Sequence, residues 1–377
     1  MLVWDAALRA YDFGSTHPLT PLRFGPGIDL LRAYGADRLL APEPATDDDL
    51  ARLHDGGYIR AVRATSVDPS WPAAAGIGTA DVPAFAGMHD AAALIAGGSL
   101  DAVEAILGGR TEHAFNPAGG LHHAMADRAS GFCIYNDVAL GVARARDAGH
   151  RVLYVDLDVH HGDGTQALFW DDPDVLTLSI HESGHTLFPG SGAVTEMGGA
   201  GAEGTAVNIP LAAGAGDESW WPAVEASVRD LAEVFRPTFL VSQHGCDSHA
   251  WDPLAHLRVT TAAYARACEL LDHVAHASCE GRWLATGGGG YDAYRVVPRS
   301  WAIVWLAQAH LEPPATTPPE WRERWADAAD AYGQAPLPGE LIDAPGTAIA
   351  DPPDVASRHH ELATRSVEAA LAALGRA

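Results

Sequence analysis

The amino-acid sequence predicts an α/β fold with a single doubly wound, mostly parallel β-sheet and helices on both of its faces. Two observations lead to this prediction. Short apolar runs alternate along the chain with longer alanine-rich stretches, an order typical of alternating strands and helices. Most of these apolar runs are also continuous, as expected for parallel strands that are buried on both faces.

The individual elements follow from the positions of these runs. Six strands are expected, over residues 2–4, 113–116, 152–159, 175–180, 239–243 and 283–286. Helices are expected between them, over residues 90–107, 138–148, 220–234 and 261–277. Strands that alternate with helices of this length favour βαβ units, in which the paired strands run parallel.

One catalytic domain is expected over residues 1–310, followed by a tail over residues 311–377. Nine prolines between positions 311 and 353 predict an irregular segment on the surface. The tail ends in an expected helix over residues 357–374, with apolar residues near one face. The pair His359 and His360 is expected on a solvated face of this helix and receives no function.

Composition argues against several classes of function. The 377-residue chain has a formal net charge of −25, and a surface this acidic repels phosphate backbones, so direct nucleic-acid binding is not expected. All 24 residues counted as lysine or arginine are arginine, which excludes a Schiff-base lysine and a lysine general base. The acidic surface would instead attract basic partners.

The sequence predicts a cytoplasmic protein with reduced thiols. Its four cysteines show neither a C-x-x-C pair nor the spacing of a secreted disulfide framework. The first residues include an early aspartate and no long apolar run, so no signal peptide is expected. No uncharged apolar run reaches about 18 residues, so no membrane span is expected. The sequence does not indicate an oligomeric state.

The segment YVDLDVHHGDG carries the strongest functional signal. Side chains two apart on a strand share a face, so Asp156, Asp158 and His160 are expected on the same side. Burying two carboxylates beside an imidazole is costly unless a cation compensates, which a divalent metal ion at the end of the strand would do. Asp247 follows a later strand and completes a three-ligand site with an open position, typical of catalytic zinc. The weaker alternative is a strand that runs into a polar glycine turn.

Two further segments predict acid–base and oxyanion groups. The segment GGLHHA places His122 beside His123, where carboxylates such as Asp156 and Asp163 could orient them for proton transfer. Four glycines precede Tyr291, whose hydroxyl could hydrogen-bond a developing oxyanion. Each segment alone is also compatible with an ordinary polar turn.

Taken together, these segments resemble the zinc-dependent histone deacetylase superfamily, most of all its bacterial acetoin-utilisation type, which is akin to class I histone deacetylases. The resemblance rests on GGLHHA, RASGFC, DLDVHHGDG, LFPGSG and GGGGYD, which follow in that order between about residues 17 and 305. It implies the arginase–deacetylase fold and hydrolysis of the amide between a short acyl group and a lysine amine. It also implies zinc as the cofactor, although iron(II) or cobalt(II) would suit the ligands as well.

The resemblance also implies a role for each site residue. The zinc ligands would be Asp158, His160 and Asp247. The tandem histidines would be His122, paired with Asp156, and His123, paired with Asp163. His123 would act as general base and then as general acid, His122 would stabilise charge, and Tyr291 would polarise the substrate carbonyl. The substrate tunnel would be formed by Gly131, Phe132 and Phe188, with Leu254 nearby and Asp81 holding the substrate backbone at the rim. From the residues alone, both aromatic side chains could equally belong to the core.

Structural potassium ions are a further implication of the resemblance. An inner potassium site would use Asp156, Asp158, His160, Ser179 and Ile180. A second potassium site would use the carbonyl groups of Phe169, Asp172 and Val175. Asp163 stands where an asparagine would indicate class II, which favours the class I type.

Three alternatives to a protein lysine deacetylase stay open. A manganese ureohydrolase of the same fold would need ligands for two metal ions and would leave Tyr291 without a task. A deacylase of acetylpolyamines or other small molecules would share nearly all of the motifs and differ only at the rim. An inactive binder of acylated lysine would lack a ligand or the tyrosine, and neither is missing. The expected partner is therefore an acylated lysine in a protein or peptide.

Overall fold

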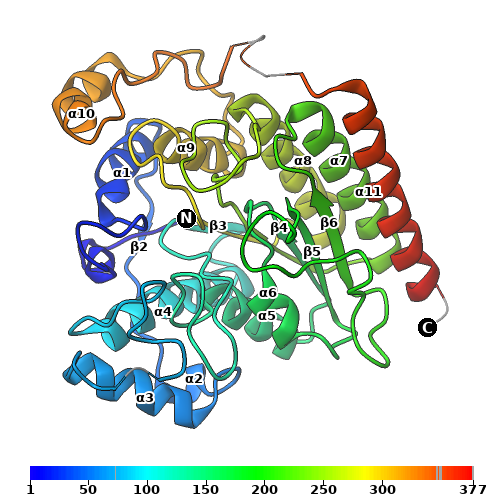
Figure 1. Ribbon diagram of the computed structural model, residues 1–377, viewed down its shortest axis with the longest axis horizontal. Coiled ribbons are helices and arrows are strands. Elements are labelled where there is room, and N and C mark those ends of the chain that lie inside the picture. The colour runs from blue at the N-terminus through cyan, green and yellow to red at the C-terminus, as the bar shows by residue number, and fades with distance from the viewer. Residues whose placement is uncertain (73, 345–346, 348–349, 376–377) are drawn as a thin grey trace.

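Eight parallel strands form one sheet in the computed structural model, which describes residues 1–72, 74–344, 347 and 350–375 (Figure 1). The strands are β1 (Leu2–Val3), β2 (Leu39–Leu40), β3 (His113–Asn116), β4 (Val152–Asp156), β5 (Val175–Glu182), β6 (Ala206–Leu211), β7 (Phe239–Gln243) and β8 (Trp283–Thr286). They are ordered β2-β1-β3-β8-β7-β4-β5-β6 across the sheet. All neighbouring pairs run parallel, so the predicted α/β fold is confirmed.

Helices cover both faces of this sheet. The α-helices of the described residues are α1 (Phe24–Ala33), α2 (Asp47–Leu50), α3 (Gly56–Val67), α4 (Met88–Leu107), α5 (Asp137–Asp147), α6 (Asp163–Leu168), α7 (Asp217–Phe235), α8 (Thr261–Cys279), α9 (Val297–Gln308), α10 (Pro319–Ala331) and α11 (Pro353–Leu374). In Figure 1, α4 and α5 lie on one side of the sheet, and α7, α8 and α9 lie on the other.

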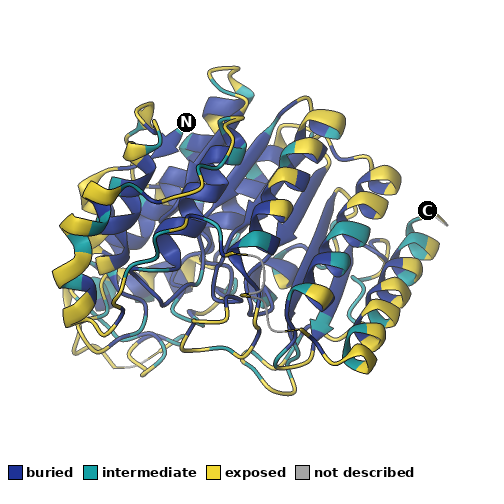
Figure 2. Ribbon diagram, turned by 90° about the horizontal axis from the view of Figure 1, so that it is seen from above, coloured by how far each residue is buried: buried dark blue, intermediate teal, exposed yellow. Residues whose placement is uncertain are grey.

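The core consists of two apolar layers, one on each face of the sheet. In β4, Leu153 and Val155 pack into the layer that contains α7 and α8, whereas Val152 and Tyr154 pack into the layer that contains α4 and α5. Figure 2 shows the buried strands between helices whose outer faces are exposed. This two-sided burial explains why the strands are continuous apolar runs.

Two strands were not predicted from the sequence. The strands β3, β7 and β8 begin and end at the predicted residues, but β2 and β6 were missed. The first has only two residues, too few for a recognisable apolar run. In the second, Asn208 and Pro210 interrupt the run, and proline is tolerated because β6 lies at an edge of the sheet.

Strand β4 is shorter than predicted and ends at Asp156 instead of residue 159. The Asp156 carboxylate accepts a hydrogen bond from the amide of Asp158 (3.1 Å), and the Asp158 carboxylate accepts one from the amide of His160 (3.0 Å). Such local bonds from side chain to backbone favour turns over a continued strand. The strand periodicity predicted beyond Asp156 is therefore wrong, although the three side chains still lie in one region.

The proline-rich segment is more ordered than predicted because it contains α10. Prolines stand at the N-cap and the first position of this helix, where a missing amide hydrogen costs little. The indole of Trp321 donates to a backbone carbonyl of α1 (2.9 Å), and the indole of Trp325 donates to Asp29 of α1 (3.1 Å). Two tryptophans therefore attach the segment to the domain. Pro345, which belongs to the same segment, lies outside the described residues.

The predicted terminal helix is present as α11, which packs against α7 and β6. His359 was expected on its solvated face, but this side chain is buried. Its Nδ1 lies 2.8 Å from the Ser219 hydroxyl, and its Nε2 accepts a hydrogen bond from the amide of Ala212 (2.9 Å). The prediction was wrong because it treated polar residues of this helix as exposed, while His360 is exposed as expected. Within the described part of the chain, none of the helices has the length and apolar character needed to cross a membrane.

Candidate active site

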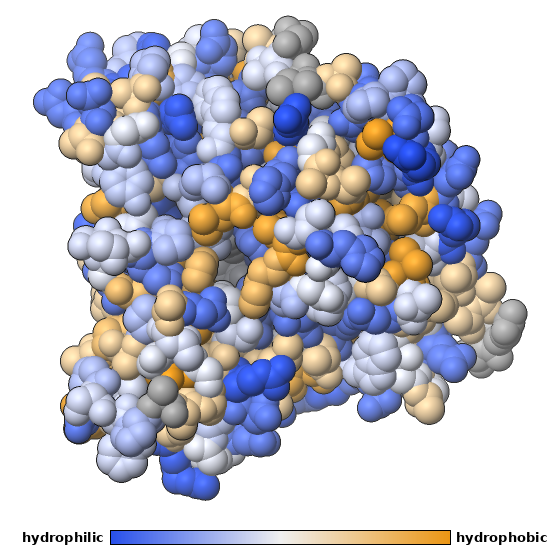
Figure 3. Space-filling model, in the orientation of Figure 1, coloured by the Kyte–Doolittle hydropathy of each residue, from blue (hydrophilic) through white to orange (hydrophobic). Residues whose placement is uncertain are grey.

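Four neighbouring strands bring the predicted site residues together at the carboxyl ends of the strands. The strands β3, β8, β7 and β4 are adjacent. The loops after their carboxyl ends carry, in the same order, His122 with His123, Tyr291, Asp247, and Asp158 with His160. Ligands of open α/β sheets bind at this end of the strands. Figure 3 shows a hollow near the middle of the visible face, with apolar side chains around it.

Asp158, His160 and Asp247 form a buried group with the spacing of metal ligands. His160 Nδ1 is 3.0 Å from Asp158 Oδ1 and 3.1 Å from Asp247 Oδ2. In a tetrahedral zinc site with bonds of about 2.0–2.1 Å, two neighbouring ligand atoms lie about 3.3 Å apart. The three side chains therefore stand close to the positions that one such ion would require.

Hydrogen bonds from the backbone and from one glutamine fix the two carboxylates. Asp158 Oδ2 accepts from the side-chain amide of Gln243 (2.7 Å) and from the backbone amide of Gly289 (2.8 Å). Asp247 Oδ1 accepts from the amide of Val159 (2.9 Å). A Cβ atom at residue 289 would lie 2.0 Å from Asp247 Oδ2, so only glycine allows this close approach. Contacts of this kind orient the ligands of a metal ion.

The charges of this group also favour a cation. Burial and the nearby Asp158 carboxylate raise the pKa of Asp247 to about 6. Burial alone would lower the pKa of His160, but the hydrogen bonds and charges of both carboxylates raise it to about 10. A proton on His160 offsets one of the two carboxylate charges in the protein alone, and a divalent cation in its place would offset both. The donor set therefore fits a metal ion.

Each of the tandem histidines has a carboxylate of its own. His122 Nδ1 lies 2.8 Å from Asp156 Oδ2, and His123 Nδ1 lies 2.7 Å from Asp163 Oδ1. The two Nε2 atoms are 3.0 Å apart. A hydrogen bond at Nδ1 fixes the orientation of each ring and leaves Nε2 as the atom available for chemistry.

The surroundings give the two histidines opposite charge states. Burial alone would lower the pKa of His122, but the Asp156 and Asp158 carboxylates raise it to about 9. Burial and the adjacent His122 charge lower the pKa of His123 to about 4. Near neutral pH, His123 is therefore neutral and able to accept a proton, while His122 is positively charged.

A narrow cavity connects these groups with Tyr291. It has a volume of about 20 Å³ and is lined by Leu19, Gly120, Leu121, His122, His123, Gly131, Phe132, Cys133, Asp158, His160, Gly288, Gly289 and Tyr291. Tyr291 makes its hydrogen bonds to described residues through its backbone, with its amide donating to Asp252 and its carbonyl accepting from Gln334. Burial raises the pKa of Tyr291 well above its ordinary value, with the nearby carboxylates adding to the effect. Its hydroxyl therefore stays protonated and can donate a hydrogen bond.

Aromatic rings stand on two sides of the tandem histidines and Tyr291. The Phe132 ring meets the Tyr291 ring edge-on at 6.0 Å, and the Phe188 ring meets the His123 ring edge-on at 5.0 Å. Phe132 has a φ of 65°, which is rare for a bulky side chain. A Cβ atom at Gly131 would lie 2.3 Å from His123 Cδ2. Gly131 therefore allows the wall of the cavity to approach the histidine.

The two remaining residues predicted to bind substrate lie outside the cavity lining. Asp81 is half-buried, and its Oδ2 accepts a hydrogen bond from the amide of Gly131 (2.7 Å). This bond ties Asp81 to the loop that forms the cavity wall. Leu254 is exposed, and its amide donates to Asp252 Oδ1 (2.9 Å). Leu254 is thus connected to Tyr291 through a shared aspartate.

The residues predicted to bind potassium fall into two separate regions. On adjacent strands, Asp156 pairs with Ser179, which precedes Ile180, and the Ser179 hydroxyl lies 2.8 Å from His181 Nδ1. The second region is the turn after α6. There the amide of Asp172 donates to the carbonyl of Phe169 (3.0 Å), and the amide of Val175 donates to the carbonyl of Asp172 (3.4 Å).

Three residues of the site were not predicted from the sequence. Arg23 is buried and donates to the carbonyl of Gly288 (2.7 Å) in the glycine loop before Tyr291. Asp252 accepts a hydrogen bond from the backbone amide of Tyr291 (2.8 Å). Gln243 holds Asp158, and its polar character at the end of an apolar strand was the one signal in the sequence that could have indicated it. Arg23 is distant in sequence, and Asp252 lies in an ordinary polar turn.

Comparisons with known proteins agree with this geometry. Residues 17–308 match the histone deacetylase domain family. The chain is 40% identical over 362 residues to the acetoin utilization protein AcuC of Bacillus subtilis (strain 168), covering 91% of this chain and 94% of that protein. It is 36% identical over 348 residues to AcuC of Staphylococcus xylosus, covering 90% of each.

Two solved structures are similar over nearly the whole chain. One is a crystal structure of an HDAC homolog complexed with SAHA, with 29% identity and a TM-score of 0.83, covering 96% of this chain and 98% of that chain. The other is an HDAC homolog from Aquifex aeolicus, with 28% identity, the same TM-score and the same coverage.

Proposed function

Because the chain belongs to the histone deacetylase family of hydrolases, we propose that it removes acetyl or other short acyl groups from lysine side chains of proteins. We further propose that Asp158, His160 and Asp247 hold zinc as the cofactor. One observation carries the proposal: a buried group of metal-ligand type adjoins a neutral, carboxylate-bound histidine at the end of a narrow cavity. Such a constellation suits hydrolysis of an amide.

The chain's own residues account for the proton transfers. Zinc bound at this group would supply Lewis acidity both for a water molecule and for the amide carbonyl. His123 Nε2 accepts a proton from the water as its oxygen attacks the carbonyl carbon. The Tyr291 hydroxyl donates a hydrogen bond to the carbonyl oxygen as negative charge develops on it. His123 then returns the proton to the nitrogen as the carbon–nitrogen bond breaks, which releases acetate and the lysine amine.

The neighbouring carboxylates set the orientation of the two histidine rings and influence their charge states for these steps. Asp163 keeps the His123 ring in place, and the low pKa of His123 leaves its Nε2 unprotonated near neutral pH. Asp156 holds His122, whose positive charge lies next to the reacting atoms and stabilises negative charge there. Two adjacent histidines can thus have different tasks because their carboxylates and charges differ.

The cavity supports an unbranched aliphatic substrate. Its lining by Phe132 and Gly131 suits the flank of a straight methylene chain. Phe188, which lies outside this lining but beside His123, would form the opposite wall. An inactive binder of acylated lysine would lack one of the chemical groups, and the chain retains all of them. A ureohydrolase is disfavoured because the family assignment is to deacetylases.

We propose that Asp81 at the rim holds the backbone of a peptide substrate. Asp81 Oδ2 accepts the Gly131 amide, and Oδ1 has no hydrogen-bond partner among the described residues. A peptide could place a backbone N–H against Oδ1.

We also propose the two potassium sites, in which the cation would brace the loop after β4 and the turn after α6.

The test is a comparison of acetyl-lysine peptides with acetylpolyamines at moderate and high salt, using the zinc-loaded chain and the variant Asp81→Ala. We expect a higher kcat/KM for peptides, more clearly at high salt, because salt screens the general attraction of a −25 surface for cations. Asp81→Ala should reduce peptide turnover more than polyamine turnover. Equal or better turnover of acetylpolyamines by the unmodified chain at moderate salt would reject the protein substrate and favour the small-molecule alternative.

A further inference from the structure

A second cluster of metal-ligand side chains lies at the amino end of β3, whereas the candidate active site lies at the carboxyl ends of the strands. His113 is the first residue of β3, Asp272 and His276 lie one turn apart on α8, and His310 follows the end of α9. The ligand atoms of these four residues all lie within 4.8 Å of one another. The amino end of β3 faces away from the loop that carries His122 and His123, so the two groups are separate.

The spacing within this cluster resembles a tetrahedral metal site. Asp272 Oδ1 lies 3.2 Å from His310 Nε2, 3.7 Å from His276 Nε2 and 3.8 Å from His113 Nδ1. The two exposed histidines approach each other with 3.1 Å between their Nε2 atoms. These distances bracket the value of about 3.3 Å expected between neighbouring ligand atoms around a tetrahedral zinc ion.

His113 is the buried member of the cluster, and its side chain is only 5% exposed. The ring nitrogen that faces Asp272 is Nδ1, which also lies 2.9 Å from the carbonyl oxygen of Gln308. A metal ion bound at Nδ1 would replace this contact with Gln308. The other ring nitrogen, Nε2, is buried and has no hydrogen-bond partner among the described residues.

The backbone at His310 has a φ of 54°, in the left-handed region that favours glycine. Arg236 and Glu280 adopt nearly the same φ at the ends of α7 and α8. The conformation of His310 is therefore that of a helix C-terminus and does not by itself indicate a metal site.

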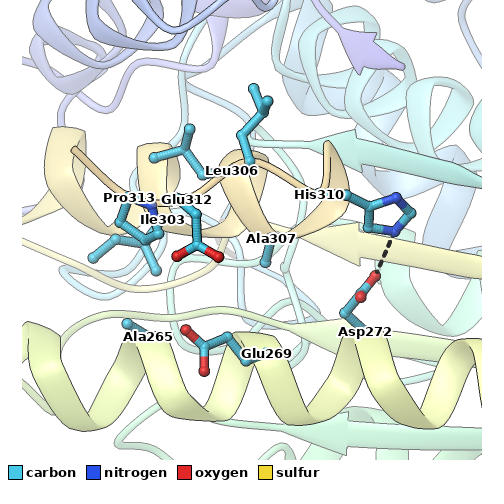
Figure 4. A pocket seen from close by; sticks show the side chains of 10 residues that line it. Ala265, Glu269, Asp272, Ile303, Leu306, Ala307, His310, Glu312 and Pro313 are labelled. Carbon is cyan, nitrogen blue, oxygen red and sulfur yellow. Dashed lines mark hydrogen bonds and ion pairs between the residues drawn. The ribbon is translucent and has the colours of Figure 1, made fainter.

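The surroundings admit and attract a cation. A groove of about 270 Å³ between α8 and α9 opens beside the cluster, and Glu269, Asp272, His310 and Glu312 are among the residues that line it. Figure 4 shows Asp272 pointing from α8 toward His310, with the two glutamates along the same groove. No basic residue other than His310 lines this groove among the described residues. The negative local charge would concentrate divalent cations from solvent.

We propose that His113, Asp272, His276 and His310 bind a zinc ion. Three imidazoles and one carboxylate select a borderline transition metal over magnesium or calcium, which prefer oxygen ligands. Four protein ligands leave no open position, so the ion is structural. It links β3, α8 and the segment after α9, and the inference does not depend on the proposed deacetylase function. The rival interpretation is a hydrogen-bonded histidine network that binds no metal.

The test measures zinc per chain after equilibration with zinc buffered by a chelator, so that isolated surface carboxylates stay empty. The test variant is His276→Gln with His310→Asn, which changes two exposed residues and keeps a side chain that tolerates positive φ. The matched control is His273→Gln, an exposed histidine on the same helix outside the cluster. A further variant, Asp247→Asn, reports on the candidate active site separately.

We expect the unmodified chain and the control to bind one zinc ion more than the double variant. Zinc should also raise the melting temperature of the double variant less than that of the control, because a ligand that binds only the folded state stabilises it. Equal zinc content in the double variant and the unmodified chain would overturn the proposal. Failure of the active-site assignment has a different result, in which Asp247→Asn loses no zinc while the double variant does.

Discussion

Single side chains at the candidate active site owe their roles to their immediate neighbours. Tyr291 is held by its backbone, through Asp252 and Gln334, so its hydroxyl is not committed to another described residue. Burial keeps that hydroxyl protonated. A donor that is fixed in position and does not have to reorganise is most effective where charge develops during the reaction.

Replacing Tyr291 with phenylalanine should therefore lower kcat with little effect on folding or metal content. The ring and its contact with Phe132 remain, and only the hydroxyl is lost. Loss of one oxyanion donor typically costs about 10²–10³ in rate. The measurement is steady-state turnover of an acetyl-lysine peptide, with zinc content and melting temperature as controls. A decrease in kcat of less than about threefold would exclude this role for Tyr291.

At this scale the sequence indicated the residues that we propose to act on the substrate better than those that support them. The metal-binding and tandem histidine segments combine several ionisable residues, which is unusual in buried strands and loops. Arg23 and Asp252, in contrast, contact the site through single hydrogen bonds to distant backbone atoms. Such contacts leave no periodic or local pattern in a sequence, so only the folded structure reveals them.

At the scale of elements, loops at the carboxyl ends of the strands position the chemistry, and the tail helps to hold them. Gln334, which follows α10, donates to the carbonyl of Tyr291 (3.2 Å) and accepts from the amide of Tyr294 (3.0 Å). Its side chain is buried. The tail thus hydrogen-bonds the backbone of the loop that carries Tyr291, and its role is to position this loop rather than to act in catalysis.

Gln334→Ala should lower kcat with little change in KM. The substitution leaves two buried backbone groups unpaired, which loosens the loop, and small displacements of a catalytic group can cost on the order of tenfold to a hundredfold in rate. Gln334→Glu keeps the acceptor for Tyr294 but replaces the donor to the Tyr291 carbonyl with a carboxylate oxygen, so it should also lower kcat. A purely structural role predicts a lower melting temperature with unchanged kcat per folded molecule, and that outcome would remove Gln334 from the positioning of Tyr291.

The elements that were predicted correctly are those with long or uniform patterns. The helices α4, α7 and α8 have extended apolar faces, and β7 and β8 each begin with three consecutive apolar residues. The helix α10 was missed because its prolines were interpreted as helix breakers, although two of them stand at its start. The tryptophans that attach it to α1 are 295 and 296 residues away in the sequence from their partners, and local sequence patterns do not indicate such contacts.

At the scale of the whole molecule, stability should depend on pH through buried neutral histidines. His54 lies in the loop after α2, where its Nδ1 faces the carbonyl of Met125 (2.9 Å) and its Nε2 accepts the amide of Asn136 (3.1 Å), the N-cap of α5. Burial lowers the pKa of His54 from 6.5 to about 4. Protonation would set an N–H at Nε2 against the amide of Asn136.

The free energy of unfolding should therefore decrease as the pH falls from about 6.5 to about 4. The unfolded chain binds a proton in this range while folded His54 does not, so the stabilisation is complete above the unfolded pKa and lost below it. The gap between the two pKa values corresponds to about 3 kcal/mol. Denaturant unfolding at pH 7 and pH 5 should show about 2 kcal/mol of this difference, because pH 5 lies above the folded pKa of His54. His54→Gln should show a weaker pH dependence than His185→Gln, an exposed control, and equal slopes would contradict the assignment.

The fold class could be predicted from the sequence, but the order of the strands could not. Continuous apolar runs in alternation with helices indicate a parallel sheet. They do not indicate that β8 lies between β3 and β7, which is what brings Tyr291 next to the histidines and the metal-binding group. The order depends on which helix faces pack together over long sequence separations. The resemblance to a known family supplied that arrangement as an expectation.

The most direct test of the account is a zinc titration of the metal-free chain, followed by turnover of an acetyl-lysine peptide. It is best done in the His276→Gln, His310→Asn background, in which the second cluster no longer competes for zinc. We expect no turnover without metal and a linear increase that saturates at one zinc ion per chain. In the same background Asp247→Asn should bind zinc weakly and stay inactive. Full turnover by the metal-free chain, or by Asp247→Asn without bound zinc, would contradict a metal-dependent deacylation at Asp158, His160 and Asp247.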